Sequence, residues 1–262
     1  MQFSAQNATI LPMLTLLLSL AHAAPTSATI TTVIDGDSFI LDSGDRIQLR
    51  GVVAPVAGAD YGIEARELVR HLVAEGEVYL AYRPGEEPVK RASVRTMEGD
   101  LAISLLEQGF AHLYILPPDN LDLTMLLTAQ NAARAAGRGI WGTERFSGEL
   151  HIVEFVANAE GDDRENVNGE YLRICNTGVR SMDLSGSTLR DKGGNLWVLP
   201  PMILPVGHTV LVHSGVGINQ SDPAQQLMIY LGSDRPIWNN TEDQATLTDR
   251  AGKVVDAVKQ YR

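Results

Sequence analysis

From Glu149 to the C-terminus, the chain contains no segment with the periodicity of an amphipathic helix. Instead, short runs of β-favouring residues alternate with connectors that are rich in Gly, Asn, Asp and Pro. The clearest runs are Ile152–Ala157, Tyr171–Cys175, Leu196–Leu199, Thr209–His213, Leu227–Leu231 and Ala245–Thr248. Strands at this spacing predict an antiparallel β-sandwich for the second half of the chain.

The first half mixes strands with helices. Two extended runs meet at Asp35-Gly36, a dipeptide that favours a β-hairpin, and a third strand is predicted at Ile47–Val53. Apolar residues at helical spacing, together with helix-closing glycines, predict three helices. The predicted helices cover 65–73, Leu101–Gln108 and Leu121–Ala136, and shorter strands cover Val78–Tyr82 and Ser93–Thr96. The change from mixed helices and strands to short strands alone places a domain boundary near Thr143–Gly148.

The first 23 residues carry no Asp, Glu, Lys or Arg. An apolar run from Ile10 to Leu20 precedes Ala21-His22-Ala23, the small-x-small pattern of a cleavage site. This run is shorter than a membrane span, so it predicts a secretory signal peptide over residues 1–23 and a secreted or periplasmic mature chain without a transmembrane span. Because no Lys or Arg precedes the run, an uncleaved anchor is the alternative.

Charge and cysteine usage restrict the function classes. The formal net charge is −11, and residues 24–146 carry 11 basic against 17 acidic side chains. An acidic surplus disfavours indiscriminate binding to nucleic acid, although it leaves room for a local basic groove. The single cysteine, Cys175, excludes an internal disulfide framework, and its apolar neighbours predict a small core residue. The histidines show no metal-ligand spacing, and we expect most of them at the surface or at strand edges.

The segment Val33-Ile34-Asp35-Gly36-Asp37-Ser38-Phe39 resembles the opening hairpin of the thermonuclease (staphylococcal nuclease-like) family. The likeness continues in order through Ile47–Pro55, Tyr61–Arg66, Asp100–Tyr114 and Ala132–Gly142, and so covers about 110 residues. This resemblance implies an OB-type five-stranded barrel with three helices, which we expect over residues 24–146.

The same resemblance implies a metal-dependent phosphodiesterase site. Family members hold the metal with carboxylates on the opening hairpin and in an Asp-x-Pro-Glu turn, and two arginines stabilise the phosphate. In this chain the hairpin carboxylate is Asp37, with Asp35 beside it, and the second arginine falls at Arg91. The first arginine position holds Gln48, and the turn places valine at the metal carboxylate and at the water-activating glutamate, as Val53 and Val56.

Three of the five implied positions are therefore neutral. Loss of a general base costs about 10²–10⁴ in rate, and loss of an arginine clamp on a phosphoryl group costs about 10³–10⁵. Arg50 is a possible substitute for the arginine replaced by Gln48, but it lies about 7 Å further along the strand. Hairpin chemistry alone explains Asp35-Gly36-Asp37, and a solvated basic stretch is an equal explanation of Arg91.

Residues 149–262 resemble a lamin tail domain of the bacterial type. The resemblance rests on Ile152–Asn158, Asn168–Asn176, Asp183–Asp191, Trp238–Asp249 and Gly252–Asp256. It implies an immunoglobulin-like β-sandwich, a fold that is often appended to exported hydrolases. No catalytic pairing is visible in this half, so it indicates an interaction module for a protein or cell-surface partner.

Together these patterns predict an exported, mainly β protein in which an inactive nuclease-like barrel precedes a lamin tail domain over residues 149–262. We expect it to act by binding, without a cofactor, and acidic charge does not favour nucleic acid as the ligand. The alternative is a weak or repurposed phosphodiesterase acting on DNA or RNA outside the cytoplasm. That enzyme would use Asp37, Arg91 and Arg50, with Ca²⁺ at Asp37 and Asp35.

Overall fold

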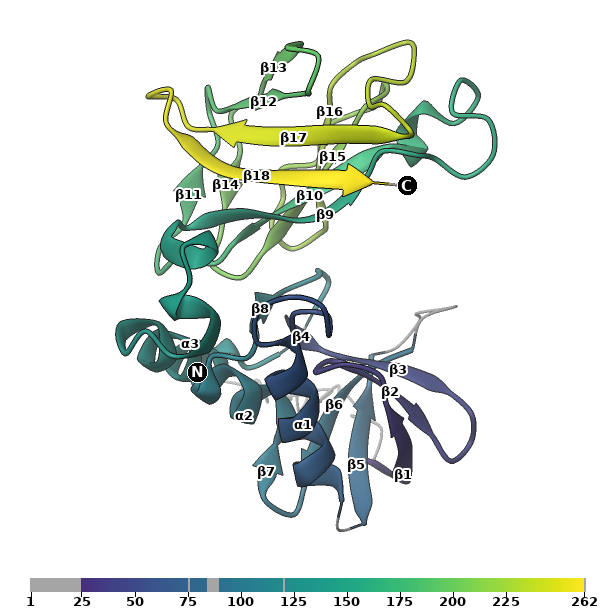
Figure 1. The fold of residues 1–262 in the computed structure, drawn as a ribbon, viewed down its shortest axis with the longest axis vertical. Coiled ribbons are helices and arrows are strands. Elements are labelled where there is room, and N and C mark those ends of the chain that lie inside the picture. Colours follow the sequence, from purple (N-terminus) through teal and green to yellow (C-terminus); the bar gives the residue numbers. More distant parts are fainter. Residues whose placement is uncertain (1–24, 75, 84–89, 120, 262) are drawn as a thin grey trace, which may run out of the picture.

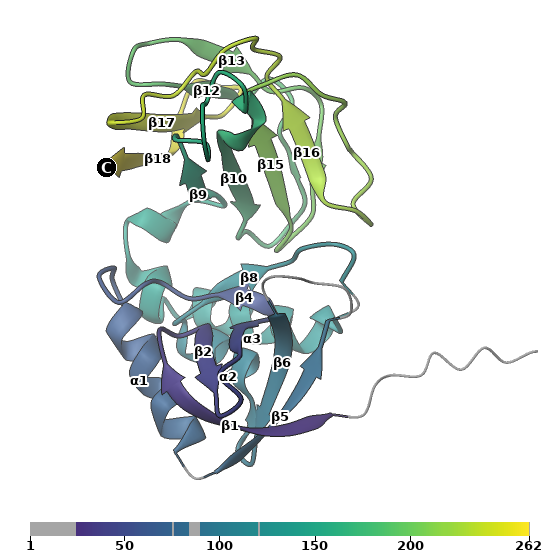
Figure 2. The same cartoon turned by 90° about the vertical axis from the view of Figure 1, so that its right-hand side faces the viewer.

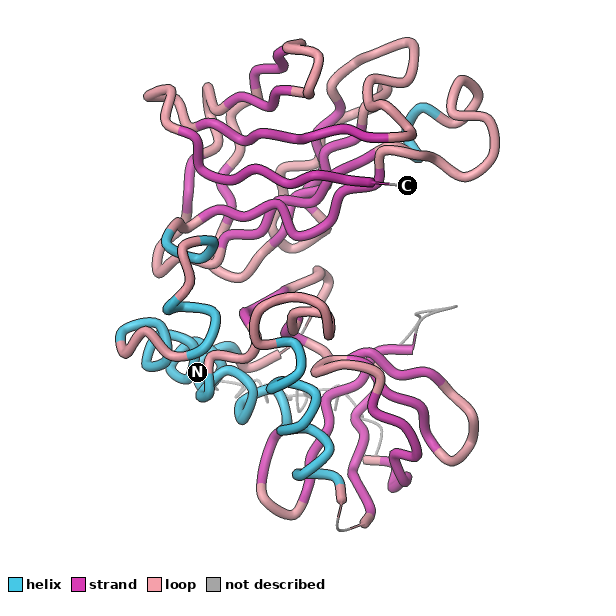
Figure 3. Tube along the Cα trace, viewed as in Figure 1, coloured by secondary structure: helices cyan, strands magenta, loops and turns pink. Residues whose placement is uncertain are grey.

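The computed structural model describes residues 25–261 except 75, 84–89 and 120, and the predicted signal peptide lies outside these residues. The chain forms two bodies, each with its own hydrophobic core (Figure 1). All the α-helices belong to the first body, whereas the second consists of strands, loops and one short 3₁₀ turn (Figure 3). Within the described residues, no helix is both long enough and apolar enough to cross a membrane.

Five strands close the barrel of the first body. They are β1 (Thr26–Val33), β2 (Ser38–Leu41), β3 (Arg46–Leu49), β5 (Glu77–Tyr82) and β6 (Lys90–Thr96). The neighbours pair antiparallel in the order β3-β2-β1-β5-β6, and a parallel pairing of β3 with β6 completes the circle. Phe39, Ile47, Leu80 and Leu105 are completely buried inside. Each such side chain contributes about 1.5–3 kcal/mol of burial free energy.

One predicted strand is divided in two. The sequence predicts a single strand at Ile47–Val53, but β3 ends at Leu49 and a separate strand, β4 (Gly51–Val53), follows. Gly51 has a φ of 82°, a left-handed conformation that bends the chain between the two strands and that a glycine adopts without strain. As a result β4 leaves the barrel and pairs with β8 (His112–Tyr114) between the two bodies.

Three helices pack against the barrel. They are α1 (Gly62–Val73), α2 (Leu101–Gln108) and α3 (Leu123–Ala135), close to the predicted ranges. The short strand β7 (Gly99–Asp100) leads into α2, and Asp100 caps that helix by accepting hydrogen bonds from the amides of Ala102 and Ile103. Two 3₁₀ turns, η1 (Gly139–Gly142) and η2 (Arg145–Ser147), lead out of the first body.

The second body is a β-sandwich. One sheet has the order β16-β15-β10-β9, built from β9 (Leu150–Val156), β10 (Tyr171–Asn176), β15 (Thr209–His213) and β16 (Leu227–Tyr230). The other has the order β13-β12-β17-β18, built from β12 (Thr188–Arg190), β13 (Leu196–Val198), β17 (Glu242–Thr248) and β18 (Val254–Tyr261). A small pair, β11 (Met182–Asp183) with β14 (Ile203–Leu204), and the turn η3 (Val167–Gly169) complete it.

The sandwich departs from the sequence prediction at one pairing. β15 and β16 run parallel, with Val210 opposite Leu227, whereas the spacing of the runs predicts an antiparallel arrangement throughout. Inward residues such as Leu172, Ile174 and Leu247 alternate with outward ones and fill the space between the sheets. The outward face of the β16-β15-β10-β9 sheet lies toward β8 and β4 (Figure 2).

Candidate functional site

The pocket implied by the nuclease resemblance lies where β3, β6, the β1–β2 turn and the turn after β4 meet. Asp37 stands at its centre and is only 3% exposed. The Ala54 amide donates a hydrogen bond of 3.1 Å to Asp37 Oδ2, and the Gln48 side chain also bonds the carboxyl. Burial, with the hydrogen bond and charge of Asp35, raises the pKa of Asp37 to about 8 despite these two donors. The carboxyl is therefore mostly protonated at pH 7.

Asp35 stabilises the turn. Its Oδ1 accepts hydrogen bonds from the Asp37 amide at 3.1 Å, the Ser38 amide at 2.7 Å and the Ser38 hydroxyl at 2.6 Å. Between the two carboxylates, Gly36 approaches the turn after β4 so closely that a Cβ would lie 2.7 Å from those of Ala54 and Ala65. The local geometry thus accounts for Asp35 and Gly36 as hairpin chemistry.

The two valines add no ligand to this pocket. Val53 lies half-buried on β4 opposite His112, and Val56 is 64% exposed in the following turn. Within the described residues, no three His, Cys, Asp or Glu side chains come together so that they could hold a metal ion. Ca²⁺ requires several oxygen ligands, so one protonated carboxyl does not fit this cation.

Arg50 is engaged in an ion pair and is therefore a poor substitute for the missing phosphate-binding arginine. Its guanidinium is 7% exposed and forms an ion pair with Asp119, whose side chain is 4% exposed. The remaining cavity, between Gln48, Arg50, Arg91 and Tyr114, has a volume of about 10 Å³. That cavity, whose lining does not include Asp37, holds at most one water molecule.

Arg91 lies on the barrel strand next to β3. It lies on β6 directly opposite Gln48 of β3, is half-buried and lines the small cavity. A larger cavity of about 490 Å³ lies next to it and shares Arg83 and Asp119. Its walls come from both bodies, with Pro117 and Leu123 on one side and His208 and Pro223 on the other.

Sequence reasoning misses the residues that join the two bodies. The Ile115 amide donates to the Gly207 carbonyl at 2.7 Å, and Arg134 donates to the carbonyls of Thr177 and Gly148 at 2.7 and 2.9 Å. The Arg173 guanidinium lies 5.7 Å from the centre of the Tyr114 ring. These partners are far apart in sequence and carry no shared motif, so no local signal identifies them.

Buried groups at this junction include the cysteine and two histidines. Cys175 is completely buried, as the sequence predicts, and burial raises the pKa of its thiol. Its Sγ lies 3.4 Å from the Leu113 carbonyl and 4.0 Å from His112 Nδ1, but an inaccessible thiol cannot serve as a nucleophile. His112 and His151 are 4% and 0% exposed, so these two do not lie at the surface, although both belong to strands at the edge of their sheets.

Comparison with known families agrees with this geometry. Residues 46–143 match the family model of the Staphylococcal nuclease homologue, and residues 144–262 match that of the Lamin Tail Domain. A comparison with curated proteins found no match. The two matched segments follow each other in the order that the sequence resemblance predicts. The first covers the barrel from β3 onward with its helices, and the second covers the sandwich.

Proposed function

Because the chain joins a thermonuclease-like domain to a lamin tail domain, we propose that it is an exported protein that acts by binding, through an inactive barrel and an interaction module. The observation that carries this proposal is the state of Asp37. The one carboxyl kept at the family's metal position is buried, mostly neutral at pH 7 and hydrogen-bonded within the pocket. Within the described residues, no group of three possible ligands surrounds it, and one carboxyl alone does not hold a hard cation.

The surroundings of Asp37 support the same conclusion. Gln48 occupies the position where the family has its first phosphate-binding arginine, and it bonds Asp37 instead. Arg50 forms an ion pair with Asp119. Without a base and without one arginine clamp, the rate is expected to fall by about 10²–10⁴ and 10³–10⁵ respectively. The small cavity that Gln48 and Arg91 line holds at most one water molecule. No cofactor is needed for the proposed role.

A nuclease assay tests the proposal directly. The purified chain is incubated with DNA or RNA in the presence of Ca²⁺, and we expect no cleavage above the background of a mock purification. Arg91→Ala is the matched control, since it removes the one arginine that remains at a family position. Ca²⁺-dependent cleavage that disappears in Arg91→Ala would overturn the proposal.

The second candidate function is a weak or repurposed phosphodiesterase. Arg91 at its family position, with Arg83 beside it at the adjoining cavity, is the observation that favours this function. It requires a measurable activity that increases when Gln48→Arg, Val53→Asp and Val56→Glu are combined. It also requires binding of oligonucleotides that weakens steeply with salt, because phosphate contacts release counterions.

Export is supported by the leader, and it is testable on the purified protein. The mass of the chain recovered from the culture medium or the periplasm should correspond to a start at Ala24, after the small-x-small pattern. A mass that retains residues 1–23 on a membrane-bound protein would instead indicate the uncleaved anchor. For the lamin tail domain we propose a protein or cell-surface partner, to be tested by binding of the mature chain to intact cells.

A further inference from the structure

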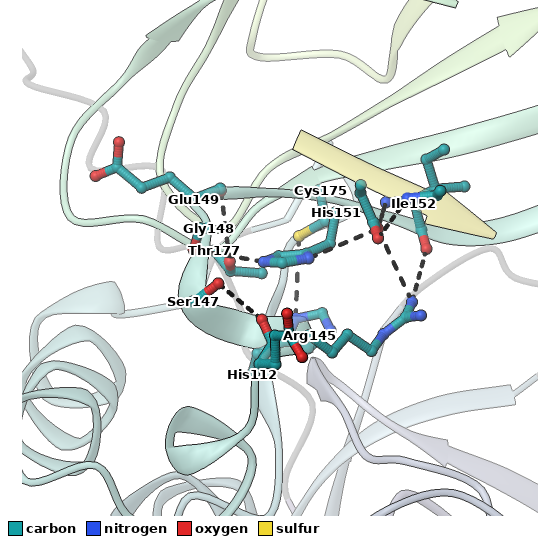
Figure 4. Close-up of polar contacts among 12 residues, drawn as sticks. His112, Arg145, Ser147, Gly148, Glu149, His151, Ile152, Cys175 and Thr177 are labelled. Atoms are coloured by element: carbon teal, nitrogen blue, oxygen red, sulfur yellow. Dashed lines mark hydrogen bonds and ion pairs between the residues drawn. The ribbon is translucent and has the colours of Figure 1, made fainter. Parts of the chain in front are cut away.

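We propose that the junction between the two domains is an acid-sensitive latch, in which the domains stay closed only while His112 of the barrel is uncharged. This inference goes beyond the proposed function and holds whether or not the barrel retains nuclease activity. It rests on a cluster of rings and charges to which both domains and the connecting turn contribute. Figure 4 shows the polar contacts around His112, Arg145 and His151.

The rings of the cluster come from three parts of the chain. His112 ends up at the junction because β8 pairs with β4 outside the barrel. Phe146, in the connecting turn η2, lies 5.6 Å from the His112 ring and 4.7 Å from the His151 ring of β9. Trp141 of η1 closes the group at 5.7 Å from Phe146. Phe146 therefore packs against both His112 of the first domain and His151 of the second.

The lamin tail domain buries His112. Cys175 of β10 lies 4.0 Å from His112 Nδ1, and the imidazole is only 4% exposed. Nδ1 lies 2.8 Å from the Leu113 carbonyl, so in the neutral ring this nitrogen carries the proton and donates it. Separation of the domains removes both Cys175 and His151 from the ring and lets water reach it.

The charged groups around His112 make protonation of its ring unfavourable. The η2 turn supplies Arg145, β9 supplies His151, β10 supplies the neutral Cys175 thiol, and α3 reaches the same turn with Arg134. The paired strand β4 supplies only Val53. Burial, together with the charges of His151 and Arg145, lowers the pKa of His112 to about 4, against the Leu113 hydrogen bond.

Asp256, a buried acid of the cluster, already has partners other than His112. Asp256 Oδ2 accepts a hydrogen bond of 2.8 Å from the Ile152 amide and lies 3.6 Å from His151 Nδ1 and 4.0 Å from Arg145 Nη2. Burial would raise the pKa of Asp256, but its histidine and arginine neighbours outweigh this effect and lower it. Asp256 therefore stays charged in mild acid and holds Arg145 and His151, which leaves His112 without a counter-ion among the contacts described.

The direction of the pH effect follows from linkage. An exposed histidine in the open form has a pKa of about 6.5, whereas His112 in the closed form has a pKa of about 4. Protons therefore bind the open form more readily, and closure weakens as the pH falls from about 6.5 to about 4. Relative to neutral pH, the ratio of closed to open molecules should fall about 30-fold at pH 5 and about 300-fold well below pH 4.

Small-angle X-ray scattering of the full chain between pH 7.5 and pH 4.5 tests the latch. We expect the radius of gyration to rise in acid while circular dichroism shows that both β-domains stay folded. His112→Phe keeps a buried ring that cannot charge, so its opening should shift to lower pH. His71→Phe, at an exposed histidine of α1, is the matched control and should open like the wild type.

Two results would overturn the proposal: no expansion of the wild type down to pH 4.5, or expansion of His112→Phe at the same pH as the wild type. If His112→Phe fails to fold, nuclear magnetic resonance titration of His112 in the wild-type chain decides. The expansion must then coincide with protonation of this ring. Expansion while His112 is still neutral would also contradict the latch.

Discussion

The pocket around Asp37 and the junction around His112 each contain a buried titratable group that is mostly neutral at pH 7. Asp37 is buried by the turns of its own domain, which raises its pKa to about 8, whereas His112 is buried at the contact between the domains, which lowers its pKa to about 4. Acid therefore favours the state in which the pocket is closed and disfavours the state in which the junction is closed. The two regions respond to pH in opposite directions.

This difference shows where each region can change. A pocket closed by local turns, as at Asp37, opens only by rearrangement within the barrel domain. A junction closed by a second domain can open while both domains keep their cores, since the hydrophobic clusters of barrel and sandwich are separate. The following changes separate the two behaviours, beginning with the largest effect.

Arg50→Ala should destabilise the barrel by about 3–5 kcal/mol, because it leaves the buried carboxylate of Asp119 without its cation. Urea unfolding of the wild type and the variant measures this change. The double variant Arg50→Met, Asp119→Leu removes both charges and should recover most of the loss. A loss below 1 kcal/mol for Arg50→Ala would mean that the ion pair does not close the pocket.

Arg134→Ala should weaken the junction by about 2–3 kcal/mol and leave the barrel intact, because the lost hydrogen bonds end on Thr177 and Gly148. Scattering profiles at pH 7 should show a larger fraction of open molecules, and acid opening should begin at a higher pH. Arg138→Ala is the control, since Arg138 donates to the Glu107 carbonyl within the first domain. Equal opening in both variants would contradict a specific junction.

These residues also show how far the sequence alone can go. Local sequence patterns predict the Asp35-Gly36 turn and the helix Leu101–Gln108. The family resemblance adds the meaning of the neutral side chains at Gln48, Val53 and Val56. The division of β3 from β4 depends on the conformation of Gly51 in its tertiary setting. The Arg50–Asp119 pair joins residues 69 positions apart, and the rings of His112 and His151 meet only after the domains dock. Such contacts have no sequence period.

Asp37→Asn sharpens the contrast in pH response. In the wild type, the free energy of unfolding should be greatest below the unfolded pKa of 3.8 and should fall as pH rises toward the folded value of about 8. Asn cannot ionise, so the variant should gain about 1–3 kcal/mol relative to the wild type between pH 5 and pH 9. Asp42→Asn, at an exposed position of the turn between β2 and β3, should show no such gain.

The smallest effect concerns Cys175, and it distinguishes a packed junction from a loose one. Because the thiol is buried against Leu113 and its pKa is raised, it should not react with a disulfide reagent in the folded chain at pH 7 and should react fully in urea. A dithiodipyridine reagent, which remains active in mild acid, extends the measurement below neutral pH. There the rate should follow the fraction of open molecules and rise between pH 6.5 and pH 4, although thiolate chemistry alone slows with acid. A rate that decreases steadily as the pH is lowered would mean that Cys175 stays covered and that the sandwich and the barrel do not separate.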